Sequence, residues 1–372
     1  MARNRCGPST IPACYHPPVR ALAIAIVDHY RARKRDLPWR RTRDPYAIWV
    51  SEIMLQQTRV ATVIPYWERW MARFPTVGAL AAAEDDDVVA AWAGLGYYSR
   101  ARNLVRGARA VVARGAMPTD AAGLRELPGI GPYTAGAIAS IAYRERTALV
   151  DGNVARVLAR VRGLDEDVKS TAGQRRLWAE ATALVEALPA DRDPGDLNQG
   201  LMELGATVCT PTAPRCADCP VAGQCVAARD GRQAELPVVP RRKASHELPE
   251  LVEVALWLLR AGKVVVARRA AAGLYGGLWE LPQGADADAA AAAIGLTLDG
   301  APVELGRHHQ VLSHRRLALT LVAARPRGRA RPTPPRYDAI RWVAPSALAD
   351  LGISAATAAL VGRALGKAGP TG

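Results

Sequence analysis

The stretch CTPTAPRCADCPVAGQC, residues 209–225, places four cysteines at Cys209, Cys216, Cys219 and Cys225. Four thiols in so short a segment can converge on one inorganic centre. Structural zinc sites usually pair their cysteines two to four residues apart on both sides, and only the middle pair has that spacing here. Four thiolates also suit an iron–sulfur cluster. Two disulfides would need an oxidising compartment, and no secretory signal points to one. The spacing by itself leaves these three alternatives open.

The composition of the 372 residues is strongly basic, with a formal net charge of +14 and a pI of about 10.0. This length suggests two or three domains at roughly 150 residues each. A basic protein of this size often binds nucleic acid, although an Arg-rich proteome produces the same excess. No apolar run is long enough to cross a bilayer. Residues 1–18, with Cys6 and Cys14, predict a loose arm without ligands rather than a secretion signal.

Helical periodicity dominates the first two hundred residues. Val19 to Ala32 predicts a first helix, and Pro45 to Trp70 predicts one or two more with an interruption near Pro65. Two further helices are expected over Thr171 to Leu188 and Asp196 to Val208.

Glu52 lies on the apolar side of its predicted helix, three and four residues after Trp49 and Ile48. Burial would disfavour the charged carboxylate and raise its pKa. A Glu at the edge of the stripe would instead reach water, and the pattern alone is more typical of this second arrangement.

Two glycine-containing turns are candidates for nucleic-acid contact. Gly94 to Asn103 combines a tight turn with two tyrosines and two arginines, which could supply a wedge between bases and cations for phosphates. Leu127 to Gly131 lies between two helical segments and exposes backbone N–H groups beside the start of the helix from Thr134 onward. Packing tyrosines and an ordinary αα-corner are the alternatives.

Asp151 lies at or just before the start of a helix whose stripe includes Val154, Val157 and Leu158. The partial positive charge of a helix N-terminus favours the carboxylate and predicts a low pKa. Asp is also a common helix cap, so this position alone assigns no chemistry.

The pattern changes after Leu251. Residues 228–249 contain three prolines and the basic run Arg241-Arg242-Lys243, which predicts a linker. Beyond it, periodicity predicts an α/β domain with a helix after Gly284 and a loop over residues 325–336; its strands are expected at Val252–Leu259, Lys263–Ala267, near Val311–Leu321 and at Ile340–Val343.

In this order the features resemble the adenine DNA glycosylase (MutY) family of the endonuclease III superfamily. The resemblance runs from about Val19 to the end. It rests on Leu37-Pro38-Trp39, on residues 51–58, 95–103, 127–134 and 150–154, and on the cysteine loop.

The resemblance implies a multidomain fold: all-α helix-hairpin-helix glycosylase domains with an iron–sulfur cluster loop, and a C-terminal α/β Nudix-like domain. The implied boundaries are an arm at 1–18, an all-α region at 19–227, a linker at 228–249 and a Nudix-like domain at 250–368. Within the all-α region, a six-helix barrel would take about 45–150 and a cluster domain 19–44 with 151–227.

The same resemblance assigns the chemistry. Glu52 falls at the family's general acid, Asp151 at the superfamily's carboxylate, and Asn153 supports Asp151. Tyr133 replaces the lysine of bifunctional relatives, which implies hydrolysis without strand cutting. The four cysteines would hold a 4Fe–4S cluster. Contacts to DNA are implied for Gln57, Thr58, Leu95, Tyr97, Gly129, Gly131, Ser313 and His314. An adenine pocket is implied at Arg35, Leu37, Trp39, Arg40, Val60 and Gln199.

The C-terminal domain is expected to bind rather than to hydrolyse. A working Nudix hydrolase needs a Glu-rich helix for Mg²⁺, and residues 285–293 contain no glutamate. In the family this domain senses 8-oxoguanine through a Phe-Ser-His motif, which is Leu312-Ser313-His314 here.

The implied function is removal of adenine mispaired with 8-oxoguanine or guanine in double-stranded DNA, by a monomer in the cytoplasm at the nucleoid, with no membrane partner. An endonuclease III-like glycosylase/lyase acting on oxidised pyrimidines is the main alternative. A DNA-tethered nucleotide pyrophosphohydrolase and a non-enzymatic iron–sulfur DNA-binding protein are two others.

Overall fold

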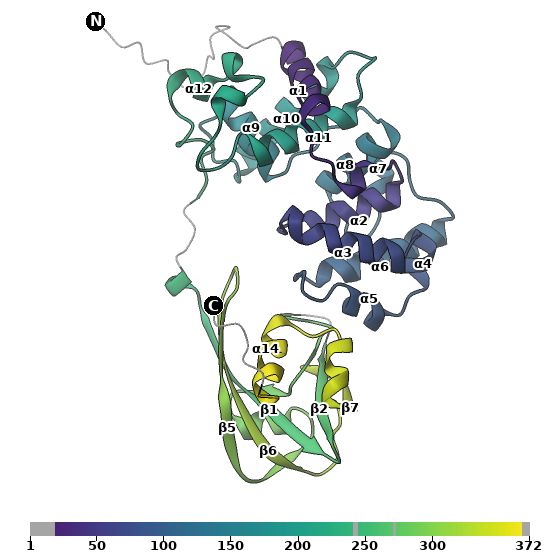
Figure 1. Cartoon of the computed structure of the whole chain (residues 1–372), viewed down its shortest axis with the longest axis vertical. Helices are drawn as coiled ribbons and strands as arrows, with labels where there is room; N and C mark the ends of the chain where they lie inside the picture. Colours follow the sequence, from purple (N-terminus) through teal and green to yellow (C-terminus); the bar gives the residue numbers. More distant parts are fainter. Residues whose placement is uncertain (1–18, 241–244, 271–272, 367–372) are drawn as a thin grey trace, which may run out of the picture. The chain divides into compact units, whose positions relative to one another are not determined.

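The computed structural model describes residues 19–240, 245–270 and 273–366 (Figure 1). The predicted arm and the basic run of residues 241–243 lie outside this part of the chain. The chain forms two compact units, one of Met1–Gln57 with Ala110–Arg241 and one of Thr58–Arg109 with Arg242–Gly372. None of the described helices is long and apolar enough to cross a membrane.

The first unit is helical. Its helices are α1 Val19–Arg33, α2 Pro45–Leu55, α7 Ala121–Leu124, α8 Pro132–Tyr143, α9 Gly152–Arg162, α10 Thr171–Ala187, α11 Pro194–Thr207 and α12 Val226–Asp230. These bounds confirm the helices predicted for α1, α10 and α11 to within two residues.

Helix α11 lies at the centre of the first unit, packed against α1, α8 and α9. Gly195, Gly200 and Gly205 are five residues apart and therefore face different sides of the helix. A Cβ at Gly195 would lie 2.7 Å from a backbone oxygen of α8. A Cβ at Gly200 would lie 2.9 Å from the Ile26 side chain of α1, and one at Gly205 would lie 2.6 Å from Asn153 of α9. The three glycines thus let three helices approach the α11 backbone closely.

The interruption predicted near Pro65 is wrong in position. Helix α2 ends at Leu55, and Gln57 has a left-handed φ of 58° that breaks the helical path. Pro65 lies inside α3, in its second turn. There the missing N–H removes one intrahelical bond, which the rest of the helix tolerates.

In the described residues, the second unit contains helices before, between and after the strands of a sheet. The helices that precede the sheet are α3 Val60–Arg73, α4 Val77–Ala82, α5 Asp85–Ala91 and α6 Ser99–Arg114, the last of which continues into the first unit. The strands are β1 Glu250–Arg260, β2 Lys263–Arg269, β3 Trp279–Glu280, β4 Gln283–Gly284, β5 Thr297–Val311, β6 Arg316–Arg327 and β7 Tyr337–Val343.

The strand order is β3-β2-β1-β6-β5, with β4 also paired to β1 and β7 to β2 (Figure 1). Strands β1 and β6 are parallel from Glu250 opposite Arg316 to Leu258 opposite Ala324, and the other pairs are antiparallel. Ala261 and Gly262 both have positive φ, 48° and 72°, which suits a two-residue hairpin. The predicted turn at Gly262 is confirmed.

Strand β1 is buried on both faces. Ala255 and Trp257 belong to a core that includes Leu360 of α14, Ala355–Ala364. Leu256 and Leu258 face the opposite core, with residues of the short helix α13, Ala287–Ala292. Burial on both faces explains why this strand is a nearly continuous apolar run rather than an alternating one.

Two details of the predicted strands are wrong. Strand β5 was not predicted, because its burial pattern is mostly exposed and carries little periodicity. The strand expected near Val311–Leu321 instead spans the turn from β5 to β6, where Leu312 N–H donates to the Arg315 carbonyl at 2.8 Å. Strand β6 then continues to Arg327, into the predicted loop.

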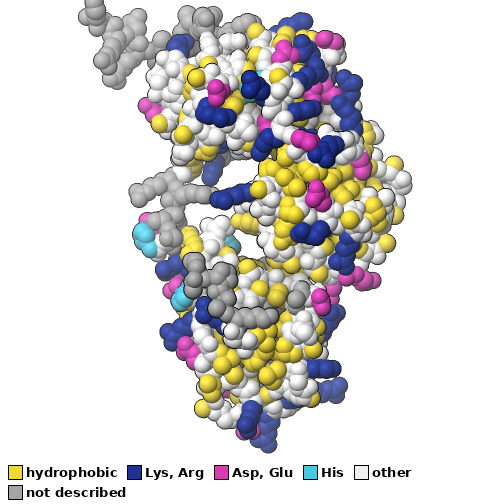
Figure 2. All heavy atoms as spheres, viewed as in Figure 1, with side chains coloured by type: hydrophobic (Ala, Val, Ile, Leu, Met, Phe, Trp, Pro, Cys, Tyr) yellow, Lys and Arg dark blue, Asp and Glu magenta, His cyan; other side chains and the backbone are white. Residues whose placement is uncertain are grey.

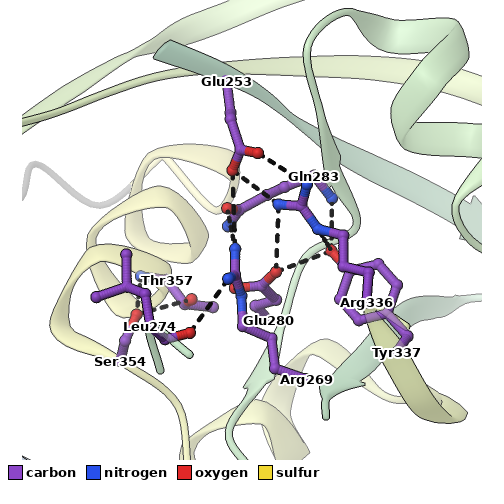
Figure 3. A network of polar contacts seen from close by, with 9 residues as sticks. All are labelled: Glu253, Arg269, Leu274, Glu280, Gln283, Arg336, Tyr337, Ser354 and Thr357. Carbon is purple, nitrogen blue, oxygen red and sulfur yellow. Dashed lines mark hydrogen bonds and ion pairs between the residues drawn. The ribbon is translucent and has the colours of Figure 1, made fainter. Parts of the chain in front are cut away.

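A buried polar network joins the strand ends in this sheet (Figure 3). Arg336 donates to both Glu253 oxygens at 2.7 Å, and Arg269 Nε donates to Glu280 at 2.7 Å. Tyr337 donates its hydroxyl to Glu280 at 2.8 Å. Two arginines balance two glutamates, which offsets much of the cost of burying the charges.

We expect Gly200→Ala to destabilise the first unit. Overpacking costs about 1–3 kcal/mol, against at most about 1 kcal/mol gained in helix propensity. Gly78→Ala is the matched control, because a Cβ there would meet only Thr76 Oγ1 at 3.8 Å. Thermal unfolding should give a lower Tm for Gly200→Ala and an unchanged or higher Tm for Gly78→Ala. Equal shifts in both variants would contradict the close packing of α1 on α11.

Candidate active site and thiol-lined cavity

Glu52 lies on α2 and is only 5% exposed. The Tyr133 hydroxyl, from the first turn of α8, donates to Glu52 Oε2 and also lies 3.3 Å from Met202 Sδ. Burial raises the pKa of Glu52 to about 7, against the opposing effect of the Tyr133 hydrogen bond. The buried alternative is therefore confirmed, and the solvent-reaching one is wrong.

Asp151 is the N-cap of α9. Its Oδ1 accepts from the Val154 N–H at 2.7 Å, and its Oδ2 accepts from Asn153 Nδ2 at 2.9 Å. The predicted low pKa is wrong, because burial raises the pKa of Asp151 despite these hydrogen bonds. Asp151 also adds to the raised pKa of Glu52, so the structure places the two carboxyls within electrostatic reach of each other.

A chain of hydrogen bonds leads from Asp151 to the cysteine loop. Arg156 Nη2 donates to Asn153 Oδ1 at 2.8 Å, and Arg156 Nε donates to the Cys209 carbonyl at 2.7 Å. Asn153 is thus held between Asp151 and Arg156, as expected for a residue that supports the carboxylate.

Glu203 of α11 organises the residues expected at the adenine pocket. Arg35 binds both of its oxygens at 2.8 Å, and Arg40 Nη2 donates to Oε2 at 2.9 Å. Burial opposes ionisation, but the two arginines lower the pKa of Glu203 to about 2. Gln199 and Arg40 line one polar cavity together. Leu37 and Trp39 are buried nearby in sequence, at the start of the short helix Pro38–Arg40.

The predicted hairpin lies between α7 and α8. Gly129 has a φ of 81°, and Gly131 is the N-cap of α8 without a capping side chain. A Cβ at Gly131 would meet nothing within 4 Å. Pro132, the first residue of α8, has no N–H, so the amides suited to a ligand such as a phosphate are those of Gly131, Tyr133 and Thr134.

Other predicted DNA contacts belong to the second unit. They are Thr58, Leu95, Tyr97, Ser313 and His314, with Val60 of the expected base pocket. Leu95 is buried, and Tyr97 is 48% exposed. The Tyr97 hydroxyl donates to Ser313 Oγ at 3.3 Å. Both side chains line a cavity of about 690 Å³ with residues 273–276 and 310–315.

The four cysteines of the loop line one cavity with Val157, Arg160 and Leu204. Arg160 Nη1 lies 3.4 Å from Cys209 Sγ and donates to the Thr210 carbonyl at 2.7 Å. Burial, reinforced by the neighbouring cysteines, raises the pKa of Cys219 to about 11. Because burial keeps the Cys219 thiol protonated, all four thiols would become thiolates only beside a cationic centre. Four cysteine thiolates are the donor set that fits an iron–sulfur cluster. Within the described residues the four thiols line this one cavity, but they are not arranged as a closed group of three or more metal ligands, so the cluster is a proposal.

Comparison with known proteins identifies the family. A model of the HhH-GPD superfamily of base excision DNA repair proteins matches residues 50–181. The chain is 43% identical over 317 residues to the adenine DNA glycosylase of Homo sapiens, covering 71% of this chain and 57% of that protein. It is 33% identical over 257 residues to the adenine DNA glycosylase of Buchnera aphidicola subsp. Baizongia pistaciae, covering 68% of this chain and 71% of that protein. The chain belongs to the adenine DNA glycosylase family.

Two further comparisons concern the two parts of the fold separately. A NUDIX domain model matches residues 254–363, which confirms the expected C-terminal α/β domain. A solved thermostable thymine-DNA glycosylase is similar over 57% of this chain and 97% of its own length, with 28% identity and a TM-score of 0.52. The chain spans about half of the length of its mammalian relatives, 57% of the human protein and 46% of those of Mus musculus and Rattus norvegicus.

Four residues of this family member escaped the sequence reasoning: Glu203, Met202, Arg156 and Arg160. Glu203 stands one turn after Gln199 on the same helix, so the spacing of four could have indicated a shared face. Arg156 and Arg160 are also spaced by four. Only the packing of α9 on the cysteine loop shows that the side chains of Arg156 and Arg160 point toward that loop.

The raised pKa of Glu52 has a consequence for stability. Between pH 4.5 and about 7, the native state binds a proton that the unfolded chain has lost. The free energy of unfolding should therefore fall by roughly 3 kcal/mol as pH rises through this window. Glu52→Gln lacks this titration, so its stability relative to the unsubstituted protein should increase from pH 5 to pH 8.

Urea unfolding at a series of pH values measures this difference. Glu68→Gln, on the exposed side of α3, is the control. Parallel pH profiles for Glu52→Gln and the unsubstituted protein would contradict the prediction, because they would mean that Glu52 has the same pKa in the native state and in the unfolded chain.

Proposed function

We propose that this protein is a monofunctional DNA glycosylase that hydrolyses the N-glycosidic bond of adenine paired with 8-oxoguanine or guanine. The observation that carries the proposal is the buried Glu52 carboxyl, which has a pKa of about 7 and lies within electrostatic reach of Asp151. Two carboxyls in one site, one of them held neutral by burial, are the arrangement used to cleave glycosidic bonds.

Glu52 is the general acid. Adenine leaves poorly unless it is protonated, and a duplex hides the base, so the nucleotide must first flip out of the stack. Near pH 7 a large fraction of Glu52 carries the proton. It donates this proton to adenine N7, so that the electron pair of the breaking C1′–N9 bond moves into a cationic ring and adenine leaves as a neutral molecule.

Asp151 faces the sugar. Loss of the base leaves positive charge on C1′, which a nearby carboxylate stabilises. The hydrogen bonds from Val154 N–H and Asn153 Nδ2 favour the ionised form against the effect of burial. Water then adds to C1′, and the Glu52 carboxylate, which has given its proton to adenine, accepts the proton that the water loses. Tyr133 offers a phenol where a lyase needs an amine, so no Schiff base forms there and the strand stays intact.

The proposed adenine pocket lies at Arg35 and Arg40, which both bond Glu203, and at the residues next to them. The Glu203 carboxylate orients Arg35 and Arg40, and Gln199 can present an amide to a base edge. The positive charge of Arg40 favours loss of the proton from Glu52. The negative charge of Glu203 offsets the charges of Arg35 and Arg40 and so limits this effect.

Double-stranded DNA is the proposed partner of a monomer that acts in the cytoplasm at the nucleoid. The Gly129 and Gly131 amides are suited to a phosphate, whereas the Ile130 N–H already donates to the Leu127 carbonyl. Tyr97 is suited to wedge between bases. Figure 2 shows Lys and Arg side chains spread over the visible face among Asp and Glu side chains. Ser313 and His314, in the exposed turn between β5 and β6, are proposed to contact the 8-oxoguanine.

The four thiols are proposed to hold a 4Fe–4S cluster. When bound, the cluster supplies a rigid link among the four cysteines and no electron to the reaction, which has no redox step. Cys209, Cys216, Cys219 and Cys225 would be its ligands, and the Arg160 side chain beside Cys209 would offset the negative thiolates.

The decisive test is single-turnover excision from a duplex with adenine opposite 8-oxoguanine. The strand should break only after alkali. Glu52→Gln should lower the rate by about 10²–10⁴-fold, and Asp151→Asn should also bind without excising. Excision by the unsubstituted enzyme should slow above about pH 7, where Glu52 ionises. Near-normal excision by Glu52→Gln would remove it as the acid, and strand breakage without alkali would favour the lyase alternative.

Metal analysis tests the cluster separately. Anaerobically purified protein should be yellow-brown with about four irons per chain, as a 4Fe–4S centre requires. Cys219→Ser should lower the iron content and the visible absorbance, whereas Ser170→Ala, at the cap of α10, should leave both unchanged. Stoichiometric zinc without iron would overturn the assignment.

A further inference from the structure

The turn of residues 94–97 holds an exposed aromatic ring in an unfavourable backbone conformation. Gly94 and Gly96 have φ of 97° and 70°, which glycine adopts readily, but Tyr97 has φ of 48°. A left-handed residue with a side chain costs on the order of 1 kcal/mol or more and persists only where its surroundings fix it. The Tyr97 ring is nevertheless 48% exposed, so burial of the ring does not explain the conformation.

Arg100, one turn into α6, supplies much of the fixing. Its Nη2 donates to the Leu95 carbonyl at 3.1 Å and to the Gly96 carbonyl at 3.2 Å. The Gly96 carbonyl also accepts from Trp92 Nε1 at 3.0 Å. The backbone N–H of Arg100 donates to the Tyr97 carbonyl at 2.9 Å. Three successive carbonyls of the turn are therefore bound by this one residue.

The same guanidinium supports the ring itself. Its central carbon lies 5.6 Å from the centroid of the Tyr97 ring and 5.3 Å from that of the Trp92 ring. Trp92 is fully buried, so it provides a fixed base, and Arg100 lies over both rings at cation–π distance. Burial lowers the pKa of Arg100 to about 10, which reflects how far its charge is withdrawn from solvent.

This arrangement differs from the role that the sequence indicated for the two arginines after the tyrosines. A cation that binds phosphate must extend its donors outward, whereas Arg100 directs Nη2 to two carbonyls of its own turn and to Thr58 Oγ1 at 3.4 Å. We propose that Arg100 is a positioning residue for the Tyr97 wedge: it holds the turn and supports the ring, so that Tyr97 meets the duplex already ordered. This inference rests on the proposed function, in which Tyr97 inserts beside the mispair.

The order of the wedge before binding matters, because inserting the Tyr97 ring into the duplex costs free energy. Unstacking a base step costs a few kcal/mol, and a mobile wedge would lose further free energy when its backbone and side chain become fixed. Substitution of Arg100 should therefore weaken binding through Tyr97, although Arg100 itself does not bind DNA.

The experiment is a double-mutant cycle on the full-length protein. Arg100→Met removes the donors at similar side-chain length, and Tyr97→Ala removes the ring. The probe is a duplex with 8-oxoguanine opposite a 2′-fluorinated adenosine that resists excision, with fluorescent 2-aminopurine next to the lesion. Arg100→Met should raise the Kd about tenfold and reduce the unstacking signal. In the Tyr97→Ala background it should change the Kd by less than about twofold.

Two controls separate positioning from other roles. Arg106→Met, on the same helix, removes an exposed arginine whose side chain bonds Asn103, and its Kd should shift equally with and without Tyr97. If Arg100 bound a phosphate, Arg100→Met would reduce the slope of log Kd against log salt by about one. The positioning role predicts an unchanged slope. Arg100→Lys keeps a charge over the rings but cannot bind both carbonyls. It should therefore raise the Kd by less than Arg100→Met does, and this increase should again depend on the presence of Tyr97. If Arg100→Met unfolds, Arg100→Lys takes its place in the cycle.

The outcomes separate this inference from the proposed function. Equal Kd changes for Arg100→Met with and without Tyr97, or a reduced salt slope, would overturn the positioning role and leave the wedge intact. Normal binding and unstacking by Tyr97→Ala would overturn the wedge assignment and this inference together. Excision chemistry at Glu52 would remain a separate question, because the probe is not cleaved.

Discussion

Burial of the Glu52 carboxyl against the Tyr133 hydroxyl is the constraint on which the candidate chemistry depends. A carboxyl in water loses its proton well below neutral pH, and an acid catalyst at pH 7 needs the proton. Packing α2 against α8 removes the carboxyl from water and raises its pKa to about 7. The Tyr133 hydroxyl supplies one hydrogen bond that limits the rise. Burial that is unfavourable for stability above pH 4.5 is therefore what the proposed general acid requires.

The helix α11 gives this pair its surroundings. Its glycines allow α1, α8 and α9 to approach closely, so α8 with Tyr133 and α9 with Asp151 are fixed against one element. The same helix carries Met202 beside the Tyr133 hydroxyl and Glu203 beneath the arginine pair. Its last turn leads directly to Cys209, whose carbonyl accepts from Arg156. The acid, the second carboxyl and the thiol-lined cavity are thus arranged around one backbone.

The protein buries charge in two different ways. In the sheet of the second unit, Glu253, Glu280, Arg269 and Arg336 neutralise one another, which leaves a satisfied network with no evident chemistry (Figure 3). At Glu52 no cation bonds the carboxyl among the described contacts, and only a neutral hydroxyl does. This contrast explains why the sheet network is structural in character, whereas the helical carboxyl is suited to proton transfer.

The sequence by itself determined the secondary structure and the types of site. Apolar periodicity predicted α1, α10 and α11, and the glycines predicted the hairpin before α8, whereas the cysteine spacing alone left an iron–sulfur cluster, zinc and disulfides open. These signals are local, because helix and turn formation depend on residues a few positions apart. Strand β5 was missed, since an exposed edge strand carries little periodicity. The break after Leu55 carries no local signal of a proline or glycine, because the left-handed residue there is Gln57.

The tertiary structure alone decided which polar residues share a site. Whether Glu52 is buried depends on α8 from eighty residues later, and the pKa of Asp151 rises because packing around α9 outweighs its helix-capping bonds. Arg100 was expected to face phosphates, and only the folded turn shows its donors directed at Leu95 and Gly96. Burial and the direction of a side chain are properties of all neighbouring elements together, so no window of sequence contains them.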